Sequence, residues 1–394
     1  MHVLLLPSWF DTVDKPWRGT FFRDQATALR RRGVDAGIAF VERRSLGHLR
    51  PRALHKSHFQ VTFEHGEVPI ARMRGWSVVA QTVPGGLLWC SLMRRLVHRY
   101  IDVYGMPDLI HGHAGLWGGY AALRTASELG IPYVVTEHAS RVLVGEREPR
   151  RRQLLAETYQ HAAAVITVSR ALQRSVEPLM NGRRTIVVPN TVDLDFFTMP
   201  RKPRTRTPFR FLTVCDLVAS KRVDLAIRAL ATLRQRGVDA TLTCAGTGKE
   251  AAALEQLARD LGIANAVTFT GALPRDAVRR ELHRANALVH PSLFETFGVV
   301  LIEALATGLP VLATRCGGPS EIIDPSLGEL VDPGSEDQLT AAMLRMTERT
   351  FDANALRASV ANRFSYDAIG AQLVSLYQRI LGDRYAERWE LAAG

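Results

Sequence analysis

Short apolar, β-branched runs alternate with amphipathic helical segments along most of this 394-residue chain. In the second half, FRFLTVC (209–215) precedes one helical segment and ATLTCAG (240–246) precedes another, and similar runs follow at 266–271, 287–292 and 310–314. Strands separated by helices predict β–α units, in which a parallel sheet is covered by helices on both faces. The predicted fold class is therefore α/β.

The first half of the chain repeats this pattern. Its β-type runs lie at residues 2–6, 34–41, 108–113, 133–138, 164–169 and 185–190. Between the halves, MPRKPRTRTP (199–208) has three prolines, four cations and no apolar periodicity, which is typical of a linker. We therefore predict two doubly wound, Rossmann-like domains that face each other across a cleft. The predicted parts are an N-terminal domain (1–198), the linker (199–208), a C-terminal domain (209–372) and a C-terminal helix that packs back towards the N-terminal domain (373–394).

The composition is basic, because 50 Lys and Arg residues outnumber 39 Asp and Glu residues and give a formal net charge of +11. Such a charge favours phosphorylated substrates, anionic lipid or nucleic acid, although a solvated surface explains it equally well. The densest basic segments, 42–58 and 147–153, lack regularly interleaved aromatic residues. A nucleic-acid partner is therefore not expected.

The apolar runs are too short for a membrane helix, which needs ~20 residues. The N-terminal MHVLLLPSWF has no basic region before its apolar run and is expected to form a first strand, not a signal peptide. The cysteines are scattered and show no metal-ligand spacing; they are Cys90, Cys215, Cys244 and Cys316. Free, mostly buried thiols fit a reducing compartment, so we expect a cytoplasmic protein.

Two glutamates, Glu295 and Glu303, interrupt the otherwise almost uncharged stretch FETFGVVLIEALATGLP. A buried carboxylate without partners is costly. The preceding strand is expected to end at Ser292 and the next helix to begin near Gly298, so Glu295 lies at the carboxyl edge of the sheet. A lone glutamate there is more often a structural cap. Two acids beside a glycine and the free N–H groups of a helix start favour a site that binds sugar or ribose hydroxyls and phosphate.

The segment HPSLFETFGVVLIEALATGLPVLATRCGGPSEII (290–323) resembles the signature of glycosyltransferase family 4, whose members are retaining enzymes of the GT-B fold. Further matching pieces occur in the same order along the chain: LPSWF…GTFFRDQATAL, DLIHGH, YVVTEH, VVPNTVDLDFF, SKRVDLAIRAL, CAGTGKE and VTFTGALP. The resemblance therefore covers most of the chain.

For the second half, the resemblance implies a nucleotide-sugar site. Glu295 would hold hydroxyls of the donor sugar, and Glu303 would hold the ribose. The backbone at the helix start would contact the sugar and the phosphates through Phe297, Gly298 and Val299.

The resemblance also implies a diphosphate-binding lysine at Lys221, which follows a strand and opens a helix. Many relatives carry an arginine where this chain has Asp216. Either Asp216 turns away from the diphosphate, or Arg222, Lys249 or Arg315 replaces the missing cation. We include Arg222 among the predicted donor-binding residues.

In the first half, strand alternation puts His111 and His113 on one face of the sheet, where a metal pair or two hydrogen-bonded histidines are the alternatives. The resemblance places His113 close to the donor sugar and the attacking acceptor, and we add His138 as an acceptor-lining residue. Gly19 resembles the family's first-loop glycine, where a bare backbone lets the phosphates or the sugar approach.

No metal or other cofactor is expected. The acidic DLD at 193–195 could be taken for a metal motif, but it follows VVPN and leads into the linker, so we interpret it as structural. The resemblance implies transfer of a sugar from a nucleotide-diphosphate sugar, with UDP favoured and GDP next, to a hydroxyl of a glycan, glycolipid or small molecule. A phosphorylase or epimerase of the same fold, or a nucleotide-sugar-binding protein, is the alternative.

The sequence is compatible with two kinds of acceptor. The helical segment 87–101 carries Leu88, Leu92, Leu96 and Val97 along one side and several arginines nearby, and the basic segment 42–58 resembles an insertion. A lipid-linked acceptor, with peripheral contact to an anionic inner membrane face, is one expectation. A soluble phosphorylated or polyhydroxylated acceptor is the other.

Overall fold

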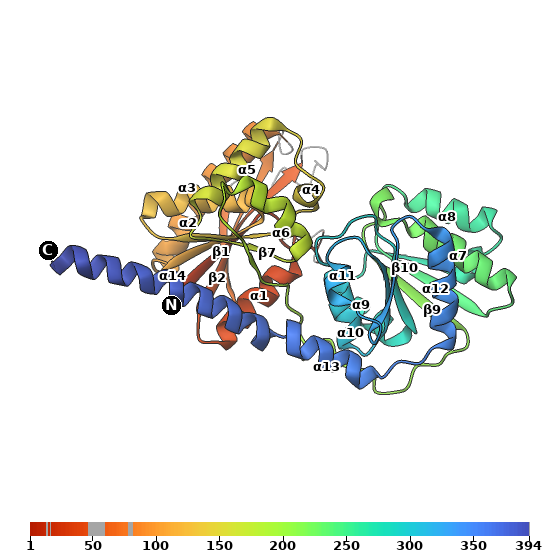
Figure 1. Ribbon diagram of the computed structural model, residues 1–394. Coiled ribbons are helices and arrows are strands. Elements are labelled where there is room, and N and C mark those ends of the chain that lie inside the picture. Colours follow the sequence, from red (N-terminus) through yellow and green to blue (C-terminus); the bar gives the residue numbers. More distant parts are fainter. Residues whose placement is uncertain (13–14, 16, 46–59, 78–81, 394) are drawn as a thin grey trace. The chain divides into compact units, whose positions relative to one another are not determined.

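The computed structural model describes residues 1–12, 15, 17–45, 60–77 and 82–393. The chain divides into two structural units, each built around its own sheet (Figure 1). Unit 1 comprises Met1–Thr191 and Tyr366–Gly394, and unit 2 comprises Val192–Ser365. Both units are Rossmann-like α/β structures, so the predicted fold class is confirmed.

Within the described residues, the sheet of unit 1 has eight strands in the order β3-β4-β2-β1-β5-β6-β7-β8. They are β1 (His2–Pro7), β2 (Asp35–Ser45), β3 (Gln60–His65), β4 (Pro69–Ser77), β5 (Leu109–His113), β6 (Tyr133–Glu137), β7 (Ala164–Thr167) and β8 (Ile186–Val187). All neighbouring pairs are parallel except β3 and β4, which form an antiparallel edge. Central strands such as β1 are almost wholly apolar because helices cover both faces.

The helices of unit 1 are α1 (Thr20–Arg31), α2 (Val83–Tyr104), α3 (Tyr120–Leu129), α4 (Ser140–Leu143), α5 (Pro149–His161), α6 (Arg170–Val176) and α14 (Tyr366–Ala393). The segment 87–101 is helical, as predicted, but its predicted apolar side is only partly buried. Leu96 and Val97 are buried, but Leu88 is 54% exposed. The buried face of α2 instead includes Trp89 and Met93, since these positions share the 3.6-residue period with Leu96 and Val97.

The sheet of unit 2 is wholly parallel, in the order β11-β10-β9-β12-β13-β14. Its strands are β9 (Phe209–Val214), β10 (Ala240–Ala245), β11 (Val267–Gly271), β12 (Ala287–His290), β13 (Val311–Thr314) and β14 (Gly328–Val331). Its helices are α7 (Val223–Gln235), α8 (Ala251–Asp260), α9 (Arg275–Arg284), α10 (Val299–Ala306), α11 (Pro319–Ile322), α12 (Glu336–Glu348) and α13 (Ala353–Phe364).

The predicted linker, 199–208, lies inside unit 2. The Arg204 guanidinium donates hydrogen bonds to the carbonyl groups of Leu282, Thr307 and Gly308, which ties this segment to the body of the unit. The DLD motif is also engaged locally, because Asp193 Oδ1 accepts hydrogen bonds from the N–H groups of Asp195 and Phe196. Of the basic segment 42–58, residues 46–58 lie outside the described part of the chain.

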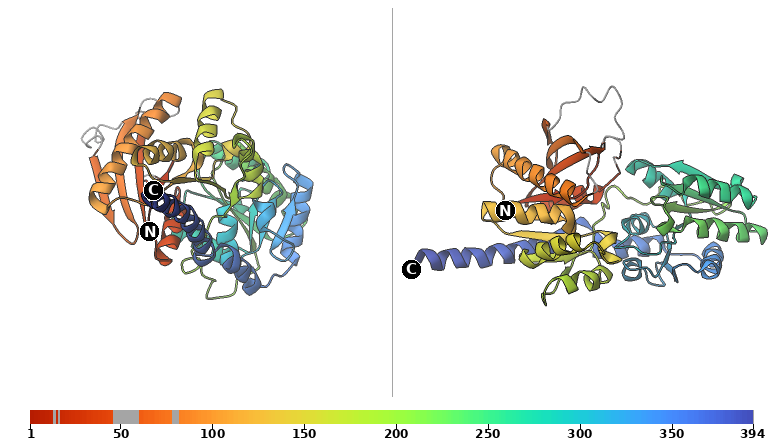
Figure 2. Two further views of the ribbon diagram at one scale, coloured as in Figure 1. Left: turned by 60° about the vertical axis from the view of Figure 1, so that its left-hand side comes forward. Right: turned by 90° about the horizontal axis from the view of Figure 1, so that it is seen from above.

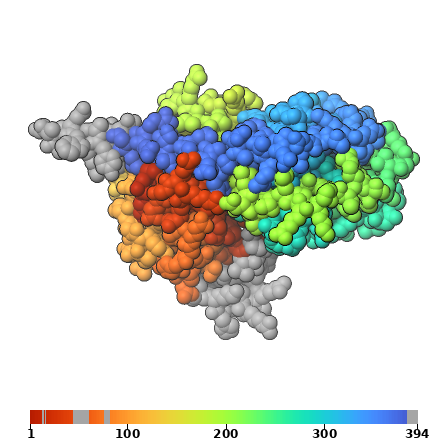
Figure 3. Space-filling model, turned by 90° about the horizontal axis from the view of Figure 1, so that it is seen from below, coloured from red at the N-terminus to blue at the C-terminus, as the bar shows by residue number. Residues whose placement is uncertain are grey.

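Helix α14 belongs to unit 1, although it is the last element of the chain. It lies beside α1, as Figures 2 and 3 show. The Tyr366 hydroxyl donates to Asp24 at 2.7 Å, and a Cβ added at Gly370 would lie 2.8 Å from the Ala28 carbonyl oxygen. The close approach of the two backbones therefore depends on glycine at position 370.

Candidate active site

Two predicted site residues meet at the carboxyl edge of the sheet in unit 2. Lys221 ends the helical turn Ala219–Lys221 after β9, and Glu295 lies in the loop after β12. Strands β9 and β12 are parallel neighbours, so the segments that follow them leave the sheet at the same edge. Lys221 Nζ and Glu295 Oε2 form an ion pair at 2.6 Å.

The Glu295 carboxylate is well enclosed, with 13% of its side chain exposed. Burial opposes its ionisation, but the hydrogen bond with His290 and the charge of Lys221 outweigh burial and hold the pKa of Glu295 well below its usual range. Burial likewise lowers the pKa of Lys221, but the ion pair with Glu295 outweighs it and raises that pKa overall. Both groups are therefore charged at neutral pH.

The loop that carries Glu295 is braced by the loop after β13. The Glu295 N–H donates to the Cys316 carbonyl at 2.9 Å, and the Gly318 N–H donates to the Glu295 carbonyl at 3.0 Å. A Cβ at Gly318 would lie 2.4 Å from the Cα of Phe297, so only glycine allows this approach. Gly318 thus allows the close approach of the two loops that holds the backbone of Glu295 in place.

Helix α10 begins immediately after this loop. Gly298 precedes its first residue, Val299, with φ +95°, a conformation that favours glycine. No described side chain caps this helix start, so its first N–H groups are available to an anion. The carboxylate of Glu295 contacts Lys221, His290 and the Thr296 N–H instead of capping α10. Phe297 is buried at the same turn.

Glu303 lies on the second turn of α10 and is partly buried. Its position, four residues after Val299, puts it on the same side of the helix as the first turn.

The cations around Lys221 differ in their partners. Arg222 has φ +48° at the start of α7 and pairs with Asp224 at 3.0 Å, while Arg315 pairs with Asp332 at 3.1 Å. Lys249 is exposed and has no ion-pair partner among the described residues.

The orientation of Asp216 was left open by the sequence, because many relatives carry an arginine at this position. The structure leaves Asp216 exposed, so its carboxylate is solvated. This arrangement is compatible with the alternative in which Asp216 turns away.

The predicted histidines of unit 1 lie together at the ends of β5 and β6. His113 Nδ1 and His138 Nε2 are 3.2 Å apart, and the rings pack against Phe21 and Phe22 of α1. Burial, together with the neighbouring histidines, holds the pKa of His113 well below its usual range, and burial lowers the pKa of His138 to about 3. Both rings are therefore neutral at physiological pH.

His111 has its own hydrogen bonds: Nδ1 contacts the Tyr377 hydroxyl at 2.6 Å and Nε2 contacts Thr136 Oγ1 at 2.7 Å. Both ring nitrogens are thereby occupied, and burial lowers the pKa of His111 to about 3. Of the two alternatives for His111, hydrogen-bonded histidine is the one observed. Among the residues that the structure describes, no group of three or more His, Cys, Asp or Glu side chains could hold a metal ion.

A buried carboxylate, Glu137, joins the loops that follow β5 and β6. Its oxygens accept hydrogen bonds from the N–H groups of Gly115, His138 and Ala139 at 2.7–2.8 Å and from the Tyr159 hydroxyl. Burial raises the pKa of Glu137, while these hydrogen bonds act in the opposite direction. Glu137 therefore fixes the backbone next to His138.

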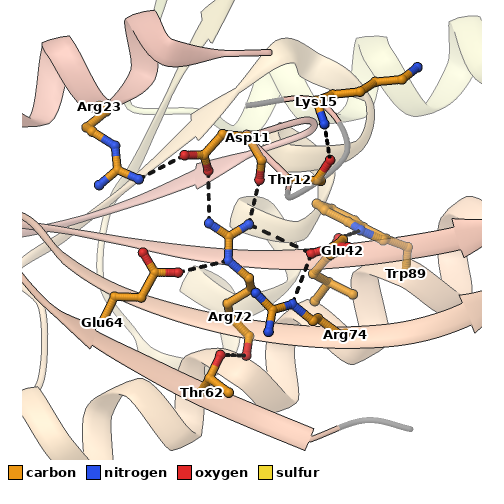
Figure 4. A network of polar contacts seen from close by, with 11 residues as sticks. Asp11, Thr12, Lys15, Arg23, Glu42, Thr62, Glu64, Arg72, Arg74 and Trp89 are labelled. Atoms are coloured by element: carbon orange, nitrogen blue, oxygen red, sulfur yellow. Dashed lines mark hydrogen bonds and ion pairs between the residues drawn. The ribbon is translucent and has the colours of Figure 1, made fainter. Parts of the chain in front are cut away.

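Asp11, which precedes Gly19 in the chain, takes part in a polar network (Figure 4). Arg72 of β4 donates to the side chain of Asp11 at 2.9 Å, to the Asp11 carbonyl at 2.6 Å and to Glu64 at 3.0 Å. Asp11 also pairs with Arg23 of α1. Gly19 itself has φ +70° just before α1, so a side chain there would be strained.

No described helix is long and apolar enough to span a bilayer. The structure thus brings together two groups of predicted residues, Lys221 with Glu295 and His113 with His138, within their respective units. It also adds His290, which no sequence motif marks, because the strand pattern gives it no more weight than its apolar neighbours.

Two doubly wound, Rossmann-like α/β units in one chain are the architecture of the GT-B fold. The family description "Glycosyl transferases group 1" matches residues 195–363, and "Glycosyltransferase Family 4" matches residues 19–196. The chain belongs to glycosyltransferase family 4 and is a glycosyltransferase, as the sequence motifs predict.

Individual proteins agree with this assignment. D-inositol 3-phosphate glycosyltransferase of Mycobacterium marinum is 30% identical over 90% of this chain and 84% of that protein. Among solved structures, sucrose-phosphate synthase of Thermosynechococcus elongatus has a TM-score of 0.77 at 20% identity, over 97% of this chain and 99% of that one. Anabaena HepE, in complex with UDP and glucose, has a TM-score of 0.71 at 20% identity, over 96% and 100% of the two chains. These structures share the fold.

Proposed function

We propose that this glycosyltransferase is a retaining enzyme that transfers a sugar from a nucleotide-diphosphate sugar to a hydroxyl group. UDP is the favoured nucleotide and GDP the next. The acceptor is a glycan, a glycolipid or a small polyhydroxylated molecule, in surface polysaccharide or natural-product biosynthesis.

The observation that carries this proposal is the ion pair of Lys221 and Glu295 beside the uncapped start of α10. An ammonium group and helix N–H groups bind phosphate oxygens, and a carboxylate accepts hydrogen bonds from sugar hydroxyls. We assign the diphosphate to Lys221 and Arg222, and the sugar to Glu295. The backbone of Phe297, Gly298 and Val299 supplies further donors.

The same groups supply the chemistry that the proposal needs. As the bond from the sugar to the diphosphate breaks, negative charge grows on the leaving oxygen, and preorganised donors stabilise that charge most strongly. Lys221 and the α10 N–H groups fill this role, so the reaction needs no metal ion. In the retaining mechanism that we propose, the departing diphosphate takes the proton of the attacking hydroxyl on the same face of the sugar.

The acceptor side is assigned to unit 1, with His113 as a catalytic residue, His138 as an acceptor-lining residue and Gly19 as a point of close backbone approach. Neutral imidazoles suit this role because they bind hydroxyl groups without adding charge. The name of the Mycobacterium marinum relative contains a phosphorylated polyol, D-inositol 3-phosphate. The net charge of +11 of the present chain is compatible with an acceptor of that kind.

Thermal unfolding in the presence of UDP-, GDP-, ADP- and dTDP-sugars tests the donor. A ligand at about 100 times its Kd stabilises the folded protein by about 2.7 kcal/mol, so the cognate nucleotide sugar stands out.

The products formed from the cognate donor separate the alternative functions. A phosphorylase would release sugar phosphate, an epimerase would change only the sugar, and a binding protein would leave the donor intact.

Glu303→Ala tests the ribose assignment, using calorimetry with the free nucleoside diphosphate. Loss of hydrogen bonds to a charged acceptor predicts an affinity loss of about 1.5–3 kcal/mol. Unchanged affinity in a folded variant would remove Glu303 from the donor site.

A further inference from the structure

A second buried polar group contacts Glu295 and has no place in the proposed reaction so far. His290 is the last residue of β12, and its side chain is 3% exposed. Its Nε2 atom lies 3.2 Å from Glu295 Oε2 and 3.0 Å from Ser292 Oγ. Because His290 belongs to a strand in the middle of the sheet, its ring is held by a rigid element.

The contact fixes where the imidazole carries its proton. An ionised carboxylate can only accept hydrogen bonds, so a favourable contact with Glu295 requires hydrogen on Nε2 of His290. Burial lowers the pKa of His290, with the hydrogen bond to Glu295 acting against it. The ring is therefore a neutral donor whose Nε2–H points at Glu295, and the Ser292 hydroxyl oxygen can accept a second branch of the same hydrogen bond.

The two donors to Glu295 differ in mobility. Lys221 Nζ and His290 Nε2 both contact Oε2, whereas Oε1 accepts from the Thr296 N–H at 3.0 Å. The lysine ammonium is a point charge at the end of a flexible chain, so a bound diphosphate competes for it. The imidazole has no such freedom and stays with the carboxylate.

We infer that His290 is a positioning residue of the donor site. Its Nε2–H holds Glu295 Oε2 in the orientation that binds the donor's sugar hydroxyls, and it continues to do so when Lys221 turns to the diphosphate. The inference rests on the proposed function, because it assigns Glu295 to the sugar and Lys221 to the diphosphate.

A matched pair of amide substitutions isolates the Nε2–H group. In His290→Gln the amide nitrogen can reach the position of Nε2, and in His290→Asn it is one methylene too short. We expect His290→Asn to lower kcat/KM for the donor by about 10- to 100-fold, the range for a hydrogen bond to a charged group, and His290→Gln to retain most activity. Affinity for the free nucleoside diphosphate, which lacks the sugar, should change by less than about 2-fold, which is less than the loss of one ordinary hydrogen bond would cause.

A control variant separates the hydrogen bond from local packing. Thr314→Val removes the hydrogen bond from Thr314 Oγ1 to the Ser292 carbonyl, on the strand next to β12, without touching Glu295. Its kcat/KM should stay close to that of the wild type. An equal loss in Thr314→Val and His290→Asn would show that packing, not the Nε2–H group, is responsible, and would overturn the inference.

A double-mutant cycle with Glu295→Gln gives the decisive comparison. If His290 acts through Glu295, the double variant His290→Asn/Glu295→Gln is no less active than Glu295→Gln alone. Independent, multiplicative losses would refute the positioning role, as would a folded His290→Gln as inactive as His290→Asn. No loss in Glu295→Gln itself would instead contradict the proposed function.

Discussion

Three buried, neutral histidines in unit 1 predict a steep loss of stability in mild acid. His111, His113 and His138 all have pKa values depressed by burial. In the unfolded chain a histidine binds a proton below about pH 6.5, whereas in the folded unit these rings do not. Their contribution to stability is therefore complete above that pH and is lost as the pH falls towards the folded values.

The size of the effect follows from the number of rings. Between about pH 7.5 and pH 5.5, one histidine with a strongly depressed folded pKa costs about 1.4 kcal/mol of unfolding free energy, so three cost about 4 kcal/mol. Glu137 acts in the other direction: burial raises its pKa, so protonation of its carboxylate favours the folded state as the pH falls.

Urea titrations followed by tryptophan fluorescence measure the unfolding free energy of unit 1 selectively, since all six tryptophans lie in that unit. The wild type is compared with His138→Phe, which keeps a ring beside Phe21 and Phe22 and removes one titrating group. We expect the stability loss between the two pH values to be smaller in the variant by about 1.4 kcal/mol. An identical loss in both proteins would refute the reasoning that His138 is buried in its neutral form.

Three further outcomes follow from the structure and from the proposed donor site. Transfer should survive EDTA, because Lys221 and helix N–H groups neutralise the diphosphate; full loss of activity that Mn²⁺ or Mg²⁺ restores would count against this. Arg72→Met should destabilise unit 1 by about 3 kcal/mol, as removal of a buried charge partner does. The more exposed Arg74→Met should cost less, and equal costs would contradict the special role of the Arg72 network. If the acceptor is lipid-linked, the protein should sediment with anionic liposomes at low salt and not at high salt; absence of sedimentation at low salt would favour a soluble acceptor.

The strand–helix alternation of the sequence was sufficient to predict the parallel architecture, and it placed Lys221 and Glu295 in segments that follow strands at the carboxyl edge. The ion pair between them was not predicted, because it depends on the pairing of β9 with β12, which are not consecutive strands of the chain. The antiparallel edge formed by β3 and β4 was not predicted. These strands carry Glu64, Arg72 and Arg74, and β4 buries Arg72 at 4% exposure only because carboxylates from separate segments surround it.

The roles of Glu137 and His290 could not be read from the sequence for a related reason. Glu137 follows a strand pattern, but its donors come from the turn after β5 and from Tyr159 of α5. Likewise His111 meets the Tyr377 hydroxyl, 266 residues later in the chain. Whether a buried polar group finds its hydrogen-bond partners depends on the tertiary structure, so periodicity and motif spacing do not reveal these partners.

The anomeric configuration of the first product tests the central proposal, retaining transfer from a nucleotide-diphosphate sugar, most directly. Proton NMR of the reaction with the cognate donor, recorded before the released or transferred sugar can equilibrate, follows the coupling constant of the anomeric proton. We expect a product with the same anomeric configuration as the donor sugar, and we expect it to form in the presence of EDTA. The Glu295→Gln variant should form it about 10- to 100-fold more slowly, because the amide accepts hydrogen bonds from the sugar hydroxyls more weakly than the charged carboxylate does. A product of inverted configuration would contradict the central proposal.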